Sequence, residues 1–386
     1  MINKEEVDQF IRKNSQLDKL TLALKLSKKP ELPSEYIINQ IQGRKIAHHK
    51  LPDWDNSNLI FPSKQAMEQC SSSTTAAHKS TLVNKGHKVV DLTGGFGVDT
   101  YYLSKGFQEV YYVEANDELF EISSNNLNLL IPNNKRTFVN DSAEAFLAEF
   151  ADKFDLIYLD PDRRVDGIKK GVKIEDCSPN LIDLESKLLE RSKQVLVKFS
   201  PLLDIKQALK QITSIDTVNI VSVNNDCKEV LFTLSKNKTD NVPINCINFT
   251  SSKEERFRFT FEEEENYNVD YSDPLKYIYE PNSAILKAGA FKSIAVQFNL
   301  KKLAINSHFY TSEELIQDFP GRCFELKTMS NQIKGLSKKA NIISRNHPLT
   351  PDEIKKKGKI KDGGNDYIIA TKLVNNKPVY LLCVRL

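Results

Sequence analysis

The sequence predicts an α/β protein built around a parallel, doubly wound sheet, with a helical region before the sheet and a small α+β region after it. Two observations support this fold class. Between about residues 87 and 236, short apolar runs alternate with stretches of helical periodicity, which is the pattern of a parallel sheet. One of these runs leads directly into a glycine-rich turn and then a helix, as the first strand of such a sheet does. The length of 386 residues leaves room for about two to three domains.

The first eighty residues are expected to be helical. Apolar side chains recur at intervals of three and four residues in two stripes, formed by Val7, Phe10 and Ile11 and by Leu17, Leu20 and Leu24. Another helix is expected to begin near Ser34, because Pro33 and Glu35 flank it in a typical helix-start pattern. The segment 51–54 interrupts this helix, and 68–79 is rich in small hydroxyl residues without clear periodicity.

The central region supplies the strands of the predicted sheet. Its expected strands are 88–92, 109–113, 154–159, 195–199, 218–223 and 230–234, with helices at 98–105 and 117–130 between the first of them. The last two strands are close together in the sequence, on either side of the turn-forming residues Asn224, Asn225 and Asp226. We therefore expect a hairpin at the edge of the sheet.

After residue 236 the alternation fades, and a smaller α+β module is expected. Its expected strands are 245–249, 256–261, 277–280, 323–326, 340–344, 367–373 and 379–384, with helices at 283–290 and 351–356. The pattern divides the chain into a helical N-terminal region (1–80), the α/β domain (81–236), a connecting segment (237–318) and a C-terminal module (319–386).

Composition excludes several classes of protein. With 40% hydrophobic and 27% charged residues the chain is expected to form packed cores. No apolar run approaches the ~18 residues of a membrane-spanning helix, and the acidic start lacks a signal peptide, so a cytoplasmic location is expected. The six cysteines include no CxxC pair and the six histidines are dispersed, so neither a disulfide framework nor a metal site is expected.

Positive charge concentrates at the C-terminal end. Residues 331–386 contain twelve Lys and Arg against four Asp and Glu, although the whole chain carries only +3. Such an end fits contact with a polyanion such as RNA. A solvated lysine-rich surface explains it equally well.

The clearest chemical signal is the segment from Val89 to Asp99, an apolar strand that enters the turn Thr93-Gly94-Gly95-Phe96-Gly97. Glycines there allow positive φ and close approach of a ligand to the backbone. The next strand ends at Glu114, whose carboxylate suits the two hydroxyls of a ribose. Asp91 and Asp99 flank the turn and would repel a pyrophosphate. The turn therefore suits a cationic ligand without phosphate, such as S-adenosylmethionine (SAM), and the alternative is a tight turn with no ligand.

The order of these motifs resembles that of the class I SAM-dependent methyltransferases, which have a Rossmann-like doubly wound sheet. The resemblance implies that the glycine turn lies under the methionine moiety, that Glu114 binds the ribose, and that Asp141, with Ser142 beside it, lies near the adenine amine. The cofactor-binding residues it implies are Asp91, Thr93, Gly95, Phe96, Gly97, Asp99, Glu114, Ala115, Asp141, Ser142 and Asp160.

A more specific resemblance covers about residues 60–386. The segments 68–72, 91–99, 160–164, 198–201, 226–229 and 279–290 recur together in a bacterial family of methyltransferases with a ferredoxin-like segment and a C-terminal THUMP-like domain. THUMP domains proper occur in RNA-modifying enzymes and help to hold structured RNA, chiefly tRNA. The resemblance therefore implies an RNA partner.

Asp160, Pro161 and Asp162 are the candidate catalytic residues. Enzymes that methylate amines usually carry an acid or Asn, two prolines and an aromatic at the end of the fourth strand. Asp160-Pro161 resembles the first half of that motif, whereas Asp162 and Arg163 depart from the second half. The acid side chain and a backbone carbonyl would accept hydrogen bonds from the target amine.

Five residues are candidates for substrate contacts. Arg163 and Arg164 can stack on a base or grip a phosphate, or one of them can pair with a loop carboxylate. Lys198 can contact the target or pair with Asp160. The remaining candidates, Ser71 and Ser72, can contact substrate or cap a helix. The run 355–359 is a candidate phosphate-contacting loop.

Cysteine catalysis, which C5-pyrimidine methylation requires, is not expected. The segment 198–201, where such enzymes commonly carry the nucleophile, has no cysteine, and Cys177 and Cys227 are interpreted as packing residues. We therefore expect a SAM-dependent methyltransferase that modifies a base nitrogen in RNA (tRNA or rRNA), without metal and without a membrane. The alternatives are a methyltransferase for a protein or small molecule, and a non-catalytic SAM-binding protein.

Overall fold

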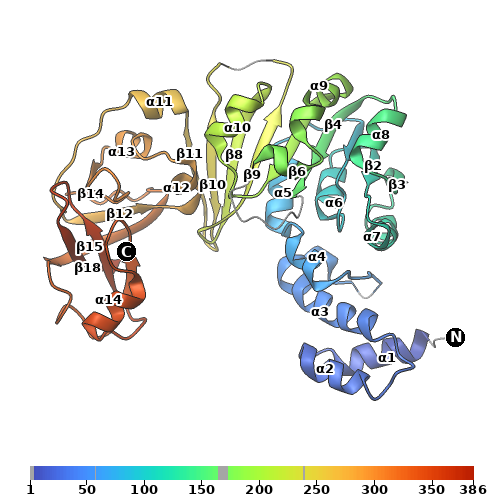
Figure 1. The fold of residues 1–386 in the computed structure, drawn as a ribbon, viewed down its shortest axis with the longest axis horizontal. Coiled ribbons are helices and arrows are strands. Elements are labelled where there is room, and N and C mark those ends of the chain that lie inside the picture. Colours follow the sequence, from blue (N-terminus) through green and yellow to red (C-terminus); the bar gives the residue numbers. More distant parts are fainter. Residues whose placement is uncertain (1–3, 57, 164–172, 238–239) are drawn as a thin grey trace. The chain divides into compact units, whose positions relative to one another are not determined.

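The computed structural model describes residues 4–56, 58–163, 173–237 and 240–386 (Figure 1). The chain divides into two compact units. The first holds residues 1–199, 206–214 and 232–238, and the second holds 200–205, 215–231 and 239–386.

The first unit begins with three helices, α1 (Lys4–Asn14), α2 (Lys19–Leu26) and α3 (Ser34–Lys50). They share a core made of Val7, Ile11, Leu22, Leu26, Leu32, Ile37 and Ile41. The predicted stripe on α2 is wrong, because Leu20 and Leu24 are 78% and 68% exposed. The side chain of Asp18 caps the start of α2, and the buried face of this helix falls on Leu22 and Leu26, which pack into the core shared with α1 and α3.

A second core joins the end of α3 to the glycine-rich turn. The short helices η1 (Pro52–Trp54), α4 (Lys64–Gln69) and α5 (Ser73–Thr81) follow α3. Trp54 and Phe61 are fully buried there and pack with Phe96, with ring centroids 4.8 and 6.1 Å from that of Phe96. Segment 68–79, for which the sequence shows no clear periodicity, thus contains the end of α4 and most of α5, and it shares a core with residues of the sheet domain.

The first unit contains five parallel strands. They are β1 (Lys88–Asp91), β2 (Glu109–Val113), β3 (Lys135–Val139), β4 (Phe154–Leu159) and β7 (Ser192–Phe199), in the order β7-β4-β1-β2-β3. Val90 stands opposite Tyr111 on one side and Ile157 on the other. Because the strands are parallel, their carboxyl ends meet at one edge of the sheet.

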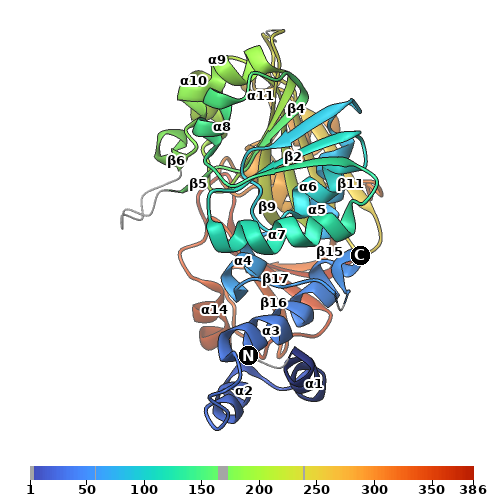
Figure 2. The same cartoon turned by 90° about the vertical axis from the view of Figure 1, so that its right-hand side faces the viewer.

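Helices cover both faces of this sheet, as expected of a doubly wound fold (Figure 2). Helices α6 (Val98–Ser104) and α7 (Asp117–Leu130) lie on one face, and α8 (Ala143–Glu149) and α9 (Leu181–Arg191) on the other. A two-stranded ribbon, β5 (Asp162–Arg163) with β6 (Cys177–Ser178), and the 3-10 helix η2 (Ile174–Asp176) follow β4. Helix α10 (Ile205–Gln211) follows β7.

The hairpin of β8 (Ile215–Val223) and β9 (Asp226–Leu234) is present, but it is not the edge of the sheet. The full strand order is β11-β10-β8-β9-β7-β4-β1-β2-β3. β10 (Ile244–Phe249) pairs in parallel with β8, and β11 (Glu254–Phe259) pairs antiparallel with β10. The expected strand pair near 245–261 therefore exists, but it extends the main sheet. The buried faces of β10 show why, because Ile244, Cys246 and Ile247 are almost fully covered.

The second unit also holds a seven-stranded sheet (Figure 1). Its order is β13-β14-β12-β15-β18-β17-β16. The strands are β12 (Tyr277–Pro281), β13 (Lys301–Lys302), β14 (Tyr310–Ser312), β15 (Gly321–Ser330), β16 (Asn341–Ser344), β17 (Asp366–Lys372) and β18 (Pro378–Arg385). The helices of this unit are α11 (Phe261–Asn266), α12 (Ser283–Ala288), α13 (Ser293–Gln297) and α14 (Pro351–Gly358).

The expectation that the run 355–359 forms a loop is wrong. Residues 355–357 form the last turn of α14, and Lys359 follows the helix in a left-handed conformation with φ of 53°. A capping box between Thr350 and Glu353 fixes the start of this helix.

Candidate functional site

The turn after β1 needs its glycines. Gly95 and Gly97 have φ of +55° and +82°, which L side chains rarely adopt. A Cβ on Gly94 would lie 2.1 Å from Cε2 of the buried Tyr112. The turn is closed by the amide of Gly97, which donates to the carbonyl of Gly94 at 2.8 Å.

Glu114, at the end of β2, is held by the same turn. Its Oε2 accepts from the amide of Gly95 and its Oε1 from the amide of Asn116, each at 2.8 Å. The carbonyl of Gly95 accepts from the hydroxyls of Tyr112 and Ser123 at 2.7 and 2.9 Å. The position of this carboxylate is thus set by backbone groups before any ligand arrives.

A pocket of about 480 Å³ lies at the carboxyl edge of the parallel strands. Its volume is in the usual range for small-molecule sites. It is lined by Ala66, Gln69, Cys70, Leu92, Thr93, Gly95, Phe96, Glu114, Ala115, Asn116, Leu119, Asp141, Ser142, Ala143, Glu144, Asp160, Asp162, Ser178 and Pro179. Five of these described lining residues are acidic and none is basic, so the pocket favours a cationic ligand over a pyrophosphate. These carboxylates fit the cationic sulfonium and ammonium groups of SAM.

Most of the predicted cofactor residues line this pocket. Those that do are Thr93, Gly95, Phe96, Glu114, Ala115, Asp141, Ser142 and Asp160, together with the catalytic candidate Asp162. Asp91, Gly97 and Asp99 are buried behind its wall, and Pro161 is buried beside Asp160. Ser142 also caps α8 by accepting from the amide of Ala145 at 3.1 Å.

Asp91 faces the protein interior. It is 1% exposed, and its carboxylate accepts from the amide of Thr93 at 3.0 Å and from the hydroxyl of Thr100 at 2.6 Å. Burial raises the pKa of Asp91 to about 7, although both hydrogen bonds oppose this. Asp91 therefore joins the turn to α6.

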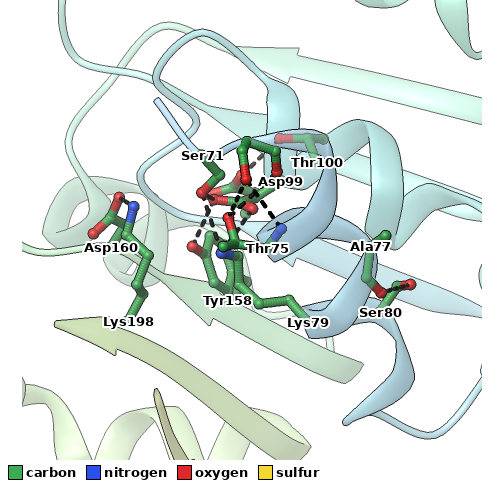
Figure 3. Close-up of polar contacts among 12 residues, drawn as sticks. Ser71, Thr75, Ala77, Lys79, Ser80, Asp99, Thr100, Tyr158, Asp160 and Lys198 are labelled. Carbon is green, nitrogen blue, oxygen red and sulfur yellow. Dashed lines mark hydrogen bonds and ion pairs between the residues drawn. The ribbon is translucent and has the colours of Figure 1, made fainter. Parts of the chain in front are cut away.

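Asp99 belongs to a buried network that includes Lys79 (Figure 3). Its Oδ2 accepts from the hydroxyls of Ser71 and Tyr158, each at 2.8 Å, and its Oδ1 lies 3.2 Å from the ammonium of Lys79. The side chain of Lys79 is fully buried and also donates to Ser71 at 3.1 Å. Burial would raise the pKa of Asp99, but Lys79, Lys198 and the hydroxyls together lower it. An ionised Asp99 thus ties α5 and the segment before it to α6.

Asp160 forms an ion pair with Lys198, as Figure 3 shows. The amide of Asp160 also donates to the hydroxyl of Thr93 at 2.6 Å, so the loop after β4 is joined to the glycine-rich turn. Lys198 thus makes the salt bridge that was one of its two predicted roles. Asp162 pairs with Ser178 through the ribbon β5–β6. Arg164 and the side chain of Arg163 lie outside the described residues.

The two serine candidates have other partners. Ser71 is buried in the network of Asp99, and Ser72 caps α5 by accepting from the amide of Thr75 at 3.2 Å. The capping alternative for Ser72 is thus confirmed. Neither serine is among the lining residues, and their contact with substrate stays a prediction.

Cys70 lines the pocket, although it was not among the site candidates from the sequence. Burial raises the pKa of its thiol, which keeps it protonated. Ala66 and Gln69 on α4, Asn116 and Leu119 at the start of α7, and Ser178-Pro179 were also missed. The sequence signal for Cys70 was the motif 68–72, from which Ser71 and Ser72 were chosen as candidates and Cys70 was not.

Comparison with family models gives three matches. Residues 62–174 match the model described as conserved hypothetical protein 95, residues 277–320 match a ferredoxin-like domain, and residues 321–385 match a THUMP domain-like family. A search of curated proteins finds no match.

One solved structure matches over the whole length. The crystal structure of a "putative methyltransferase" from Porphyromonas gingivalis W83 is 32% identical, covers 100% of this chain and 99% of its own, and superposes with a TM-score of 0.88. The fold and the pocket thus define a class I methyltransferase. The chain belongs to the bacterial family of class I SAM-dependent methyltransferases with a ferredoxin-like segment and a C-terminal THUMP-like domain. It is an enzyme of that type, and SAM is its cofactor.

Two other solved structures match less than half of the chain. An rRNA methylase from Streptococcus thermophilus is 14% identical, covers 43% of this chain and 98% of its own, and has a TM-score of 0.32. TrmK of M. capricolum, solved with S-adenosyl-homocysteine (SAH), is 12% identical, covers 42% and 68%, and has a TM-score of 0.33.

No helix in the part of the chain that the structure describes is long and apolar enough to cross a membrane. In the same residues, no group of three or more His, Cys, Asp and Glu side chains is arranged to hold a metal ion.

Proposed function

We propose that this enzyme methylates a base nitrogen in RNA. The observation that carries the RNA part is the match of residues 321–385 to a THUMP domain-like family, in a segment rich in lysine. The family's resemblance to RNA-modifying enzymes supports the same substrate class.

The pocket residues divide into three groups around the cofactor. Glu114, fixed by two amides, would accept the ribose hydroxyls. Asp141 and Ser142 would lie at the adenine end, and the turn from Thr93 to Gly97 would lie along the methionine moiety. Asp91 and Asp99 would act through the turn and α6, because their carboxylates bond to protein groups.

Asp160 and Pro161 would orient the acceptor nitrogen. The carboxylate of Asp160 and the carbonyl of Pro161 accept hydrogen bonds from an amine, which aims its lone pair at the donor. Lys198 holds the Asp160 side chain in place, and Asp162 lines the same wall. SAM, when bound, supplies the methyl group, whose transfer forms a nitrogen–carbon bond, breaks a sulfur–carbon bond and releases a proton from the nitrogen.

The RNA-contacting surface would include exposed lysines of the THUMP-like segment. Two strand-like segments meet there, because the amide of Lys361 donates to the carbonyl of Lys338 at 3.0 Å and that of Ala340 to the carbonyl of Lys361 at 3.0 Å. Four exposed lysines of these segments, which we call the lysine patch, are Lys338, Lys339, Lys359 and Lys361. Arg163 and Arg164 remain candidates for RNA contacts on the sequence alone.

The test is transfer of tritium from labelled SAM to total RNA. RNA from a strain lacking the gene is compared with RNA from the complemented strain. Label in one RNA size class from the deletion strain alone is the expected result, because the complemented RNA is already modified. Absence of label with intact SAH binding would reject RNA as the acceptor and favour a protein or small molecule, or a non-catalytic role.

A pair of variants ties the activity to Asp160. Asp160→Asn removes the carboxylate that pairs with Lys198 and that would accept from the target amine, so transfer should fall at least about tenfold. SAH binding, followed by calorimetry, should change less than transfer does. Glu121→Gln, at an exposed acid on α7, is the control and should transfer normally. Equal transfer by the Asp160 variant would remove this residue from the proposed mechanism.

A further inference from the structure

A second pocket, of about 660 Å³, lies entirely within the second unit. It forms where the turn between β8 and β9 meets the turn between β10 and β11, the start of α12, and the adjoining ends of β15 and β18. This second pocket shares no lining residue with the pocket assigned to SAM. Its wall includes Asn282, from the segment 279–290 that the sequence singled out.

The floor of this pocket is a fixed set of amides around one buried carboxylate. Oε2 of Glu255 accepts from the side-chain amides of Asn248 and Asn282 at 2.9 and 3.0 Å. Glu255 is 8% exposed and both asparagines are 2% exposed. Oδ1 of Asn248 accepts from the amide of Asn225, whose own Oδ1 accepts from the amide of Ser283. Buried polar groups bonded in this way hold their geometry before a ligand arrives.

The rim of the pocket is cationic. Lys253, Arg322 and Arg385 line it, against the single carboxylate side chain of Glu255. The ammonium of Lys253 lies 3.9 Å from Oε1 of Glu255, and Arg385 and Cys323 line the same pocket.

Arg322 is held toward this rim by Glu280. The Glu280 carboxylate is 1% exposed and is shared between Arg322 and Arg345, with Nε of Arg322 donating at 2.6 Å and Nη2 of Arg345 lying 2.8 Å away. One carboxylate therefore faces two guanidinium groups, and an excess positive charge remains beside the pocket.

We propose that this pocket binds one nucleotide, with its phosphate on the cationic rim and its sugar and base on the amide floor. A phosphate offers only acceptors, which suit Lys253, Arg322 and Arg385. Each asparagine oxygen of the floor already accepts one hydrogen bond and keeps a second lone pair, so the floor also suits a ligand that carries N–H or O–H donors. A ribose and a base edge supply them, and the volume exceeds the needs of phosphate alone. The nucleotide is either free or one unit of an RNA strand, and the strand form rests on the proposed function.

The test uses full-length protein saturated with SAH, so that the cofactor pocket is blocked. Phosphorus-31 resonances of the four nucleoside 5′-monophosphates and of inorganic phosphate are titrated with protein. Lys253→Gln with Arg385→Gln removes the two exposed rim cations and spares Arg322, whose loss would disturb the buried Glu280. Lys301→Gln with Lys377→Gln, at exposed lysines of the same unit that do not line the pocket, is the matched control.

At least one monophosphate should bind more tightly than inorganic phosphate, and the rim variant should weaken it at least fivefold. The control pair should bind like the unaltered protein. Unchanged affinity in the rim variant, or inorganic phosphate binding as tightly as every nucleotide, would overturn the proposal. The affinity for SAH, measured separately, reports that the rim variant is folded.

A competition arm separates the two sources of nucleotide. If the ligand is a unit of RNA, the monophosphate should displace a short single-stranded RNA, and the rim variant should bind that RNA more weakly. If RNA is not displaced while the monophosphate binds, the ligand is a free nucleotide. Nucleotide binding without tritium transfer to RNA would reject the proposed function alone, and transfer without nucleotide binding would reject the pocket alone.

Discussion

Lys79 is a lysine whose charged side chain is fully buried near the site. Its ammonium is bonded to Ser71 and paired with Asp99. Removing one partner of a buried pair leaves the other charge uncompensated in a medium of low dielectric constant. The network therefore makes the fold around α5 and α6 dependent on one lysine.

We expect Lys79→Met to lower the free energy of unfolding by about 3–5 kcal/mol. Adding Asp99→Asn should restore part of this loss, because the unpaired charge is then removed. Lys64→Met, which breaks an exposed pair with Glu68, should change stability by less than about 1 kcal/mol. Urea unfolding monitored by circular dichroism measures all three, and a Lys79 variant as stable as the Lys64 variant would contradict the expected role.

Asp91 should make stability depend on pH. Between its ordinary pKa of 3.8 and the folded value of about 7, the folded protein holds a proton that the unfolded chain has released. Stability contributed by this group is therefore full below the unfolded pKa and is lost as the pH rises to about 7. Asp91→Asn cannot titrate, so its stability relative to the unaltered protein should rise by up to about 4 kcal/mol from pH 4 to pH 8. A constant difference across urea titrations at these pH values would contradict the raised pKa.

At the scale of elements, the turn after β1 is the part that tolerates least change. Gly94→Ala would force its methyl against the ring of Tyr112, whose hydroxyl holds the carbonyl of Gly95. We expect this variant to lose about 1–3 kcal/mol of stability and to bind SAH at least about tenfold more weakly. Gly106→Ala is the matched control, because its nearest neighbour would be at an ordinary 3.5 Å. Equal SAH affinity of both variants by calorimetry would show that the turn does not position the ligand.

Elements buried on both faces were predictable from the sequence. β4 contains the apolar run 156–159, β1 has two valines directly before the glycine turn, and Glu114 follows the next apolar run along the chain. β3 was missed, because Lys135–Val139 is only partly buried and alternates charged or polar with apolar residues only weakly. The predicted buried face of α2 was wrong, because leucines lie on two faces of this short helix and tertiary packing against α1 and α3 selects Leu22 and Leu26.

The parts of the site that the sequence missed come from remote segments. Ala66, Gln69 and Cys70 precede the first strand by about twenty residues, and Ser178-Pro179 follow the fourth strand by a similar distance. Their place in the wall depends on how Trp54 and Phe61 pack against Phe96 and on the pairing of β5 with β6. Neither contact has a local periodicity or motif that would reveal it.

At the scale of the whole molecule, the lysine patch gives a measurable dependence of RNA binding on salt. Each lysine that neutralises a phosphate contributes about 0.7–0.9 to the slope of log affinity against log salt. Changing Lys338, Lys339, Lys359 and Lys361 together to Gln should reduce that slope by this amount for each phosphate that is no longer neutralised. SAH affinity should remain unchanged. Filter binding over a series of salt concentrations measures the slope.

The control for this experiment uses lysines at the other edge of the parallel strands. Lys85, Lys105, Lys153 and Lys193 are exposed before β1, β2, β4 and near the start of β7, away from the carboxyl ends that form the pocket. Their change to Gln removes the same formal charge. An equal decrease in slope for both sets would assign the effect to net charge and not to the patch.

Trp54 is the single tryptophan of the chain, and its ring lies 4.8 Å from that of Phe96, which lines the SAM pocket. The tryptophan fluorescence of this protein therefore comes from one indole placed next to the cofactor turn. When SAM or SAH enters and Phe96 adjusts, the emission of this indole should shift or change in intensity, with no label attached. Excitation at the red edge of absorption, where tyrosines contribute little, would turn the arrangement into an optical titration of cofactor occupancy. Phe96→Leu, which removes the aromatic link, should reduce that signal.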